Sequence, residues 1–379
     1  MVKKKILIAM LEIGNGHKAP AIALQKQLNA MYPGKYDVEV IELAQQLGSK
    51  KLFRLYHKLW VKGAFKAPKV FTAVYHITDN KFSNLLEKLF LTGLKKRTKE
   101  YIETARPDLL IGTHFTCLHV FSMLKKDVKT PVFGVNTDPF DAHHVWALPN
   151  IDRFFVFSEK AKELLSKKGV GRDTIVVYDS LYPLDPKHSK KLESKEQVRK
   201  KLGISSEKAI LIFGGAEGGG QLSKFIKKIL ENNLEFQLMV VCGRNEKLKQ
   251  ELEQLPRKTN LKIFGFMTNM EELIQSADIV MGKPGASQTF EVLVKNKPII
   301  FSSHMRNEYP TLKFVTENKM GWYAPTTGKL VNLLKNIQNN PSVLDETSKN
   351  IASMNIRSCT PELAKYIDSY LEKKSKTPP

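Results

Sequence analysis

Residues 264–291 read FGFMTNMEELIQSADIVMGKPGASQTFE. The pattern predicts a short strand, an amphipathic helix, a buried strand at 277–281, a turn around Gly285 and a second helix. Backbone N–H groups at the start of that helix could hold an anion. Glu291 could accept hydrogen bonds from the paired hydroxyls of a ribose. The segment therefore predicts a phosphate and sugar site, although an ordinary α/β crossover, whose glycine only makes the turn, would give the same pattern.

A denser glycine-rich turn lies upstream, where GGAEGGG at 214–220 follows the apolar run AILIF. Its glycines would leave backbone amides open to phosphate oxygens. It lacks the GK[ST] ending of an ATP-binding P-loop. Two turns that could bind phosphate lie in the same half of the chain, which favours nucleotide binding there. The candidate residues of this turn are Gly214, Gly215, Gly218 and Gly219.

Apolar runs alternate with helical periodicity along most of the chain, which predicts an α/β fold with parallel, doubly wound sheets. The expected strands cover 5–10, 36–43, 108–113, 131–136, 153–158, 174–178, 209–213, 236–242, 261–264, 279–281 and 298–301. The pattern restarts after a lysine-rich connection. We therefore expect an N-terminal Rossmann-like domain at 1–180, a linker at 181–200, a C-terminal Rossmann-like domain at 201–350, and a final helix and tail at 351–379.

The composition is that of a folded, strongly basic protein. The chain has 379 residues, 42% of them hydrophobic, and a formal charge of +22. Such a surface attracts polyanions, whether nucleic acid, an anionic membrane or phosphorylated substrates. The three scattered cysteines fit a reducing cytosol and argue against disulfides or a cysteine-based zinc site. We expect no signal peptide and no transmembrane helix.

A first glycine-rich turn, GNGH at 14–17, follows the first expected strand. Gly16 would allow a ligand to approach the backbone at a helix N-terminus. His17 could take a proton from an attacking hydroxyl, or merely cap the helix. Gly14, Gly16, Ala19 and Glu42 also match the outline of a dinucleotide-binding fingerprint. A Rossmann oxidoreductase is therefore an alternative from another class.

Polar residues cluster at 137–146, which read TDPFDAHHVW after an expected strand. Asp138, His143 and Trp146 could line a substrate pocket. His143 and His144 with Asp138 or Asp141 could also ligate a metal, although adjacent histidines on a strand point apart. We therefore predict no metal.

Residues 43–78 contain no Asp or Glu and seven Lys or Arg. Basic residues spaced four apart would form one stripe on a helix beside Trp60, a composition suited to the membrane interface. A core-packed helix with a solvated basic edge is the alternative. The candidate stripe includes Arg54, Lys58 and Lys62.

Together, residues 14–17, the Thr-Asp…His-x-x-Trp cluster and residues 265–293 resemble glycosyltransferase family 28. Within it, the chain resembles the branch of monogalactosyldiacylglycerol synthases and diacylglycerol glucosyltransferases. The resemblance spans about residues 5–325. It implies a GT-B fold, in which two Rossmann-like domains have parallel sheets facing a central cleft. The pair Asn307-Glu308 stands where the family usually has Gln-Glu, and the loop from Asp138 to Trp146 is one residue longer.

The resemblance also implies a UDP-sugar donor and a role for each matching residue. The glycines at 214–220 would face the pyrophosphate, Phe266 and Met267 the uracil, and Asn307 and Glu308 the hexose. Gly285, Ser287 and Gln288 would lie at the phosphates, and Glu291 would hold the ribose. His17 matches the family's proposed base, and Asp138, His143 and Trp146 match its cluster on the acceptor side. We take His17 and Asp138 as the catalytic candidates and include Gly16 among the donor-binding residues.

We therefore expect a cytoplasmic glycosyltransferase, peripheral to the inner face of the cell membrane. It would use UDP-glucose or UDP-galactose and no essential metal or cofactor, with diacylglycerol as the favoured acceptor. A polyprenyl-linked acceptor is the nearest alternative. A basic nucleic-acid-binding protein is the non-enzyme alternative, but no nucleic-acid-binding signature is evident in the sequence.

Overall fold

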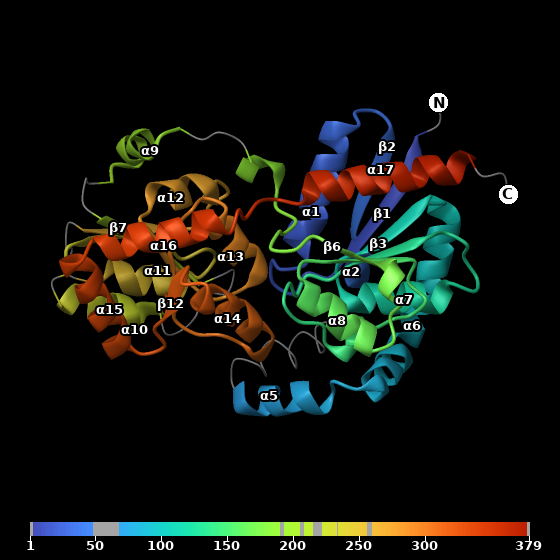
Figure 1. Cartoon of the computed structure of the whole chain (residues 1–379), viewed down its shortest axis with the longest axis horizontal. Coiled ribbons are helices and arrows are strands. Elements are labelled where there is room, and N and C mark those ends of the chain that lie inside the picture. Colours follow the sequence, from blue (N-terminus) through green and yellow to red (C-terminus); the bar gives the residue numbers. More distant parts are fainter. Residues whose placement is uncertain are drawn as a thin grey trace. The chain divides into compact units, whose positions relative to one another are not determined.

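The computed structural model describes residues 3–47, 68–189, 193–204, 208–214, 222–232, 234–255 and 260–376. The chain forms two compact units (Figure 1). Unit 1 contains residues 1–187, 305–307 and 357–379, and unit 2 contains residues 188–304 and 308–356. Each unit is built on one six-stranded parallel sheet, which confirms the predicted α/β, GT-B fold class.

The sheet of unit 1 has the strand order β2-β1-β3-β4-β5-β6. Its strands are β1 (Lys4–Met10), β2 (Tyr36–Glu42), β3 (Leu109–Gly112), β4 (Val132–Val135), β5 (Arg153–Val156) and β6 (Ile175–Val177). Its helices are α1 (Lys18–Met31), α2 (Leu43–Leu47), α5 (Pro68–Ile77), α6 (Lys81–Ala105), α7 (Phe115–Leu124), α8 (Glu159–Lys167) and α17 (Thr360–Lys376). Short 3₁₀ turns are η2 (His144–Trp146), η3 (Arg172–Thr174) and η4 (Pro186–Ser189).

The C-terminal helix α17 packs in unit 1, far in sequence from its neighbours. Tyr370 meets Phe133 of β4 edge-on, with ring centroids 4.9 Å apart. The phenol of Tyr366 accepts a hydrogen bond from Arg153 at 2.8 Å. Asp368 accepts a hydrogen bond from the Tyr36 hydroxyl at 2.6 Å. The last helix of the chain therefore completes the core of the first unit.

The sheet of unit 2 has the order β12-β11-β10-β7-β8-β9. Its strands are β7 (Lys208–Phe213), β8 (Phe236–Val241), β9 (Leu261–Phe264), β10 (Ile279–Gly282), β11 (Ile299–Phe301) and β12 (Gly321–Tyr323). Its helices are α9 (Lys195–Leu202), α10 (Leu222–Glu231), α11 (Glu246–Glu253), α12 (Met270–Ser276), α13 (Ala286–Leu293), α14 (Tyr309–Glu317), α15 (Thr327–Asn339) and α16 (Ser342–Ser353), and the turn η5 covers Arg306–Glu308.

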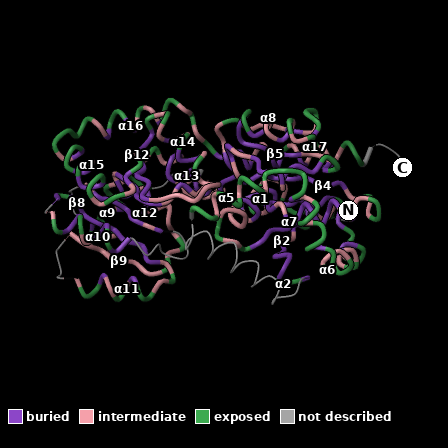
Figure 2. Tube along the Cα trace, turned by 90° about the horizontal axis from the view of Figure 1, so that it is seen from below, coloured by how far each residue is buried: buried purple, intermediate pink, exposed green. Residues whose placement is uncertain are grey.

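Both faces of this sheet are covered, so its central strands are mostly apolar. Ile210 and Ile212 of β7 face one core cluster, whereas Ala209 and Leu211 face the other. Figure 2 shows buried strands inside the more exposed helices of the chain. The short edge strand β12 was not predicted from the sequence. Only Gly321 of its three residues is buried, so it carries no strand-like alternation.

Asp278, at the start of β10, connects three elements of unit 2. Its carboxylate forms an ion pair with Lys195 and another with Arg199, at 2.6 Å, both from α9. It also accepts the backbone N–H of Ala209 at 2.7 Å. Burial raises the pKa of Asp278, but Lys195, the Ala209 amide and Arg199 together hold that pKa below its ordinary value.

Replacing Asp278 with Asn should lower the free energy of unfolding of unit 2 by about 2–4 kcal/mol at pH 7, because two cations lose their partner. The folded-state pKa of Asp278 is lowered. The stability difference between wild type and Asp278→Asn should therefore be fully present above the ordinary carboxyl pKa of about 3.9. It should vanish as the pH falls through the folded-state pKa of Asp278. Urea unfolding at several pH values measures it. The control Glu317→Gln breaks an exposed pair with Lys313 and should change stability by less than about 0.5 kcal/mol. Equal effects of the two variants would contradict this role.

Candidate active site

The candidate site of unit 1 forms at the carboxyl ends of its central strands. β1, β3 and β4 are neighbours in the sheet, so the segments that follow them meet at one edge. These segments are the turn at 14–17, Thr113 with His114, and residues 136–146. Ligands of open parallel sheets bind at this edge.

His17 is held by groups far away in sequence. Its Nδ1 lies 2.9 Å from the Thr113 carbonyl oxygen and 2.7 Å from the Thr137 hydroxyl. The Thr113 hydroxyl in turn donates to the His17 carbonyl at 2.8 Å. Because a carbonyl oxygen can only accept, Nδ1 carries the ring hydrogen and Nε2 of the neutral ring keeps its lone pair. The arrangement prepares Nε2 to receive a proton.

The surroundings of His17 keep the ring neutral. Its ring meets that of His114 at a centroid distance of 4.4 Å. Burial lowers the pKa of His17 to about 4, against a smaller opposing effect of the Thr113 hydrogen bond. His17 occupies the N-cap position of α1, but its side chain makes no capping hydrogen bond to that helix.

Asp138 and Trp146 lie close to His17. The buried Trp146 indole donates to Asp138 Oδ2 at 3.0 Å, and its ring centroid is 6.4 Å from that of His17. Asn136 fixes the start of this loop, since its side chain accepts from the Asp138 amide at 3.1 Å and donates to the Asp141 carbonyl at 2.9 Å. Sequence reasoning missed Asn136, although a polar residue directly after a buried strand is a usable signal.

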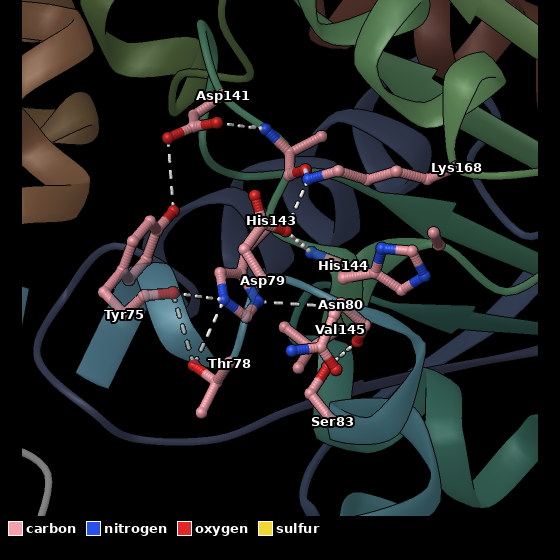
Figure 3. Close-up of polar contacts among 12 residues, drawn as sticks. Tyr75, Thr78, Asp79, Asn80, Ser83, Asp141, His143, His144, Val145 and Lys168 are labelled. Atoms are coloured by element: carbon pink, nitrogen blue, oxygen red, sulfur yellow. Dashed lines mark hydrogen bonds and ion pairs between the residues drawn. The ribbon is translucent and has the colours of Figure 1, made fainter. Parts of the chain in front are cut away.

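His143 connects the same loop to helix α5 (Figure 3). Its Nδ1 accepts the Val145 amide at 3.3 Å, and Nε2 lies 3.0 Å from the Tyr75 carbonyl oxygen and donates to it. Both ring nitrogens are thus engaged within the protein. Among the described residues, no three His, Cys, Asp or Glu side chains are grouped to hold a metal.

The dinucleotide alternative requires Glu42 to bind a ribose, but in the structure Glu42 binds backbone N–H groups of the protein. Its buried carboxylate accepts the backbone N–H groups of Glu12 and Gln45. Each carboxylate oxygen of Glu42 is thus already engaged by a backbone N–H group inside unit 1. The geometry therefore disfavours a nicotinamide cofactor at the first turn.

In unit 2, the N-terminus of α13 presents buried polar atoms. Ser287 is only 5% exposed, yet its hydroxyl has no hydrogen-bond partner within the described chain. The same holds for Gln288 Nε2 and Thr289 Oγ1. Gln288 packs so closely on Gly282 that a Cβ there would lie 2.1 Å from its Nε2. Buried polar atoms without partners are costly, so this helix start is suited to a polar ligand.

Two carboxylates lie in the same part of unit 2. A Cβ placed on Gly285 would be 3.8 Å from a carboxylate oxygen of Glu308. Glu291 lies 3.7 Å from Nε2 of the buried His188, whose carbonyl accepts the Lys295 ammonium at 2.7 Å. His188 was not predicted, because it lies far from Glu291 in the sequence and the two meet only in the folded chain.

The remaining candidates of unit 2 are less closely tied together. Phe266 is exposed, with the Arg244 guanidinium 5.1 Å from its ring centroid, and Met267 packs against the core. Asn307 is grouped with unit 1, and its side-chain oxygen has no partner among the described residues. Gly214 is buried at the end of β7. The other predicted residues, Gly215, Gly218, Gly219, Arg54, Lys58, Trp60 and Lys62, lie outside the described part of the chain.

Two family models match the chain. That of monogalactosyldiacylglycerol (MGDG) synthase matches residues 17–178, and that of the glycosyltransferase family 28 C-terminal domain matches residues 209–360. The first range begins at His17 and covers β2 to β6 of unit 1 but not β1, and the second covers the sheet of unit 2 from the second residue of β7 onward.

Relatives in plants and bacteria resemble the chain over most of its length. A processive diacylglycerol beta-glucosyltransferase of Bacillus pumilus is 30% identical over 78% of this chain and 76% of its own length. A probable chloroplastic monogalactosyldiacylglycerol synthase of Nicotiana tabacum is 27% identical over 87% of this chain. The chain spans 64% of the length of that tobacco protein and 62% of an Arabidopsis thaliana relative.

Solved structures support the fold. MurG of Acinetobacter baumannii aligns over 96% of this chain with a TM-score of 0.63 and 14% identity, covering 99% of its own chain. The MnaA–UDP structure of S. aureus aligns over 99% of both chains with a TM-score of 0.64 and 13% identity.

The tautomer and pKa of His17 can be measured directly. Nitrogen-15 NMR should find the hydrogen on Nδ1 and a ring that stays neutral down to about pH 4. His17→Gln assigns the signal. Thr137→Val is the control, because it removes a hydroxyl but leaves the Thr113 carbonyl in place, so the tautomer should persist. A hydrogen on Nε2, or titration near the ordinary pKa of about 6.5, would contradict the described geometry.

Proposed function

Because this chain belongs to glycosyltransferase family 28, in the branch of the monogalactosyldiacylglycerol synthases and diacylglycerol β-glucosyltransferases, we propose that it transfers a hexose from a UDP-sugar to diacylglycerol or a related lipid. The product would be a glycosyldiacylglycerol. UDP-glucose and UDP-galactose are both candidate donors, since the names of the relatives specify one sugar or the other.

The start of α13 carries the donor part of the proposal. The Ser287 hydroxyl and the Gln288 amide are buried polar groups without protein partners, and they lie beside the backbone N–H groups of the first helical turn. Phosphate oxygens would supply the missing acceptors, and the helix dipole favours their negative charge. Gly285 allows the diphosphate close access to this turn, and the glycines at 214–219 would line it as well.

The nucleoside and the sugar would lie around this diphosphate. Glu291 would accept the two ribose hydroxyls while His188 orients its carboxylate. Phe266 and Met267 would contact the uracil. Glu308, whose carboxylate lies close to Gly285, would bind the hexose together with Asn307. These assignments follow from matching positions in the family, and the placement of Glu308 supports them.

His17 would act on the acceptor. Its Nε2 lone pair would take the proton of the lipid hydroxyl as that oxygen bonds to the anomeric carbon of the hexose. The bond from this carbon to the phosphate oxygen breaks, and UDP leaves with the electron pair. A single displacement of this kind inverts the anomeric centre. Asp138 and Trp146 would line the acceptor side beside His17, and Gly16 would contact the donor.

The negative charge that develops on UDP needs stabilisation. Preorganised N–H groups at the start of α13 and the Ser287 hydroxyl can supply it without reorganising in the transition state. The proposal therefore requires no essential metal ion.

A lipid acceptor requires access to a membrane surface. None of the described helices is long and apolar enough to cross a bilayer. The net charge of +22 favours docking on anionic lipid, and we place the protein at the inner face of the cell membrane. The basic segment with Arg54, Lys58 and Lys62 stays a candidate contact.

Replacing His17 with Ala should lower kcat for glycolipid formation by roughly 10²–10⁴-fold, the usual contribution of a general base. UDP affinity should stay within about twofold of wild type, because the donor contacts are in unit 2. Turnover of vesicle-borne diacylglycerol and calorimetric titration with UDP measure the two effects. Unchanged turnover would refute the base assignment, and lost UDP binding would point to misfolding.

Replacing Ser287 with Ala should weaken UDP binding by about 10-fold or more, since a hydrogen bond to a charged group is lost. Uridine binding should hardly change, because the nucleoside lacks the diphosphate. Ser342→Ala, at the exposed start of α16, is the matched control. Equal losses for UDP and uridine would exclude Ser287 as a phosphate ligand.

A further inference from the structure

The first turns of α6 place their apolar residues outward. Phe82, Leu85, Leu86 and Leu89 are spaced as one helical face, and all four are exposed, Leu89 by 66%. The opposite face of the same turns carries Ser83, Asn84 and Glu87, which are buried or half-buried. From Leu91 onward, buried Leu91 and Ile102 restore the usual arrangement.

Helix α5 carries a second row of exposed apolar residues. Val70, Val74 and Ile77 recur at helical spacing and are exposed, Ile77 by 72%. We call Val70, Val74, Ile77, Phe82, Leu85, Leu86 and Leu89 the α5–α6 apolar face. Exposed Lys69, Lys81 and Lys88 lie along the same two helices, and α5 contains no acidic residue. Large exposed apolar surfaces with basic neighbours are typical of membrane contact.

The turn between α5 and α6 is tied to the loop of the candidate site (Figure 3). Asp79 accepts the His144 amide at 2.7 Å and the Lys168 ammonium at 2.5 Å. Lys168 also donates to the Ala142 carbonyl at 2.7 Å. The position of this turn and the position of residues 142–144 are therefore linked.

Each helix adds a direct contact to the same loop. The Tyr75 hydroxyl of α5 donates to Asp141 at 3.1 Å, and its carbonyl accepts His143 Nε2. From α6, the Asn84 amide donates to the Ala147 carbonyl at 3.0 Å. Moving α5 or α6 would therefore move the loop that carries Asp138 and Trp146.

We propose that the α5–α6 apolar face inserts into the interface of an anionic bilayer and, through the Asp79, Tyr75 and Asn84 contacts, positions the loop at 138–147 toward lipid at that surface. The choice of a bilayer rests on the proposed function, because a diacylglycerol hydroxyl lies at headgroup depth, where a half-inserted helix would hold the loop. The flanking lysines complement anionic headgroups, which a second copy of this basic chain would not provide.

The test uses the full chain and vesicles of phosphatidylglycerol and phosphatidylcholine, without any sugar nucleotide. Ile77→Gln/Leu89→Gln removes two inserted side chains at exposed positions, so folding should be unaffected. Vesicle affinity should fall by about tenfold or more, with most of the loss remaining at high salt. The control Thr104→Gln/Tyr323→Gln places two glutamines elsewhere on exposed surface and should bind within about twofold of wild type.

Equal vesicle binding by the two double variants would overturn the proposal. So would a wild-type dimer that becomes monomeric in Ile77→Gln/Leu89→Gln, because the face would then be covered by a second copy. UDP binding without vesicles tests the proposed donor site separately. Failure of UDP binding with vesicle binding intact would reject the proposed function and not the docking surface.

Asp79→Asn tests the link to the loop. This variant should bind vesicles like wild type but lower kcat for bilayer diacylglycerol, with the KM for the UDP-sugar unchanged. Asp79 would thus be a positioning residue that acts through His144 and Lys168. Unchanged kcat on vesicles would refute the coupling. Loss of vesicle binding together with a lower melting temperature would also refute it, because Asp79 would then serve only stability.

Discussion

The hydrogen bond from His17 Nδ1 to the Thr113 carbonyl is the interaction on which the candidate site of unit 1 depends. It exists because β1 and β3 are adjacent and end at the same edge of the sheet. It selects the tautomer of the ring, and burial keeps the ring neutral. Thr137 and Trp146 come close to the same ring from the next loop. The ring is thus placed by the backbone carbonyl of Thr113 and the hydroxyl of Thr137, which leaves Nε2 as the candidate proton acceptor.

The polar groups around His17 and those at the start of α13 differ in whether protein groups satisfy them, and the difference supports separate structural and ligand-binding roles. In unit 1, Asn136, His143 and Glu42 are engaged by protein groups that fix the loops around His17. In unit 2, Ser287 and Gln288 are buried at the start of α13 without protein partners. Unsatisfied polar groups of this kind are destabilising unless a ligand completes them. This difference supports the proposed roles, an anion bound at the start of α13 and a base held in place around His17.

Much of the fold could be predicted from the sequence, because buried parallel strands are apolar and the turns after them contain glycine or polar residues. Strand β12 was not predicted, because its three residues show no periodicity. His17 and Ser287 could be identified from the turns in which they lie. His188 could not, because its contact to Glu291 arises only in the folded chain. Asn136 was missed although it directly follows a buried strand and its contacts are local. Periodicity at 82–89 likewise reveals an apolar helical face, but not that the face points to solvent.

The central claim is that a UDP-sugar site and a lipid-directed base act in one reaction. The most direct measurement is UDP release by the wild-type chain from UDP-glucose and from UDP-galactose, on anionic vesicles with and without diacylglycerol, with mass spectrometry of the extracted lipid. The account predicts that release with one donor depends on diacylglycerol and is matched by an equal amount of hexosyl-diacylglycerol. The account would be contradicted if UDP release did not depend on diacylglycerol and no glycolipid formed from either donor.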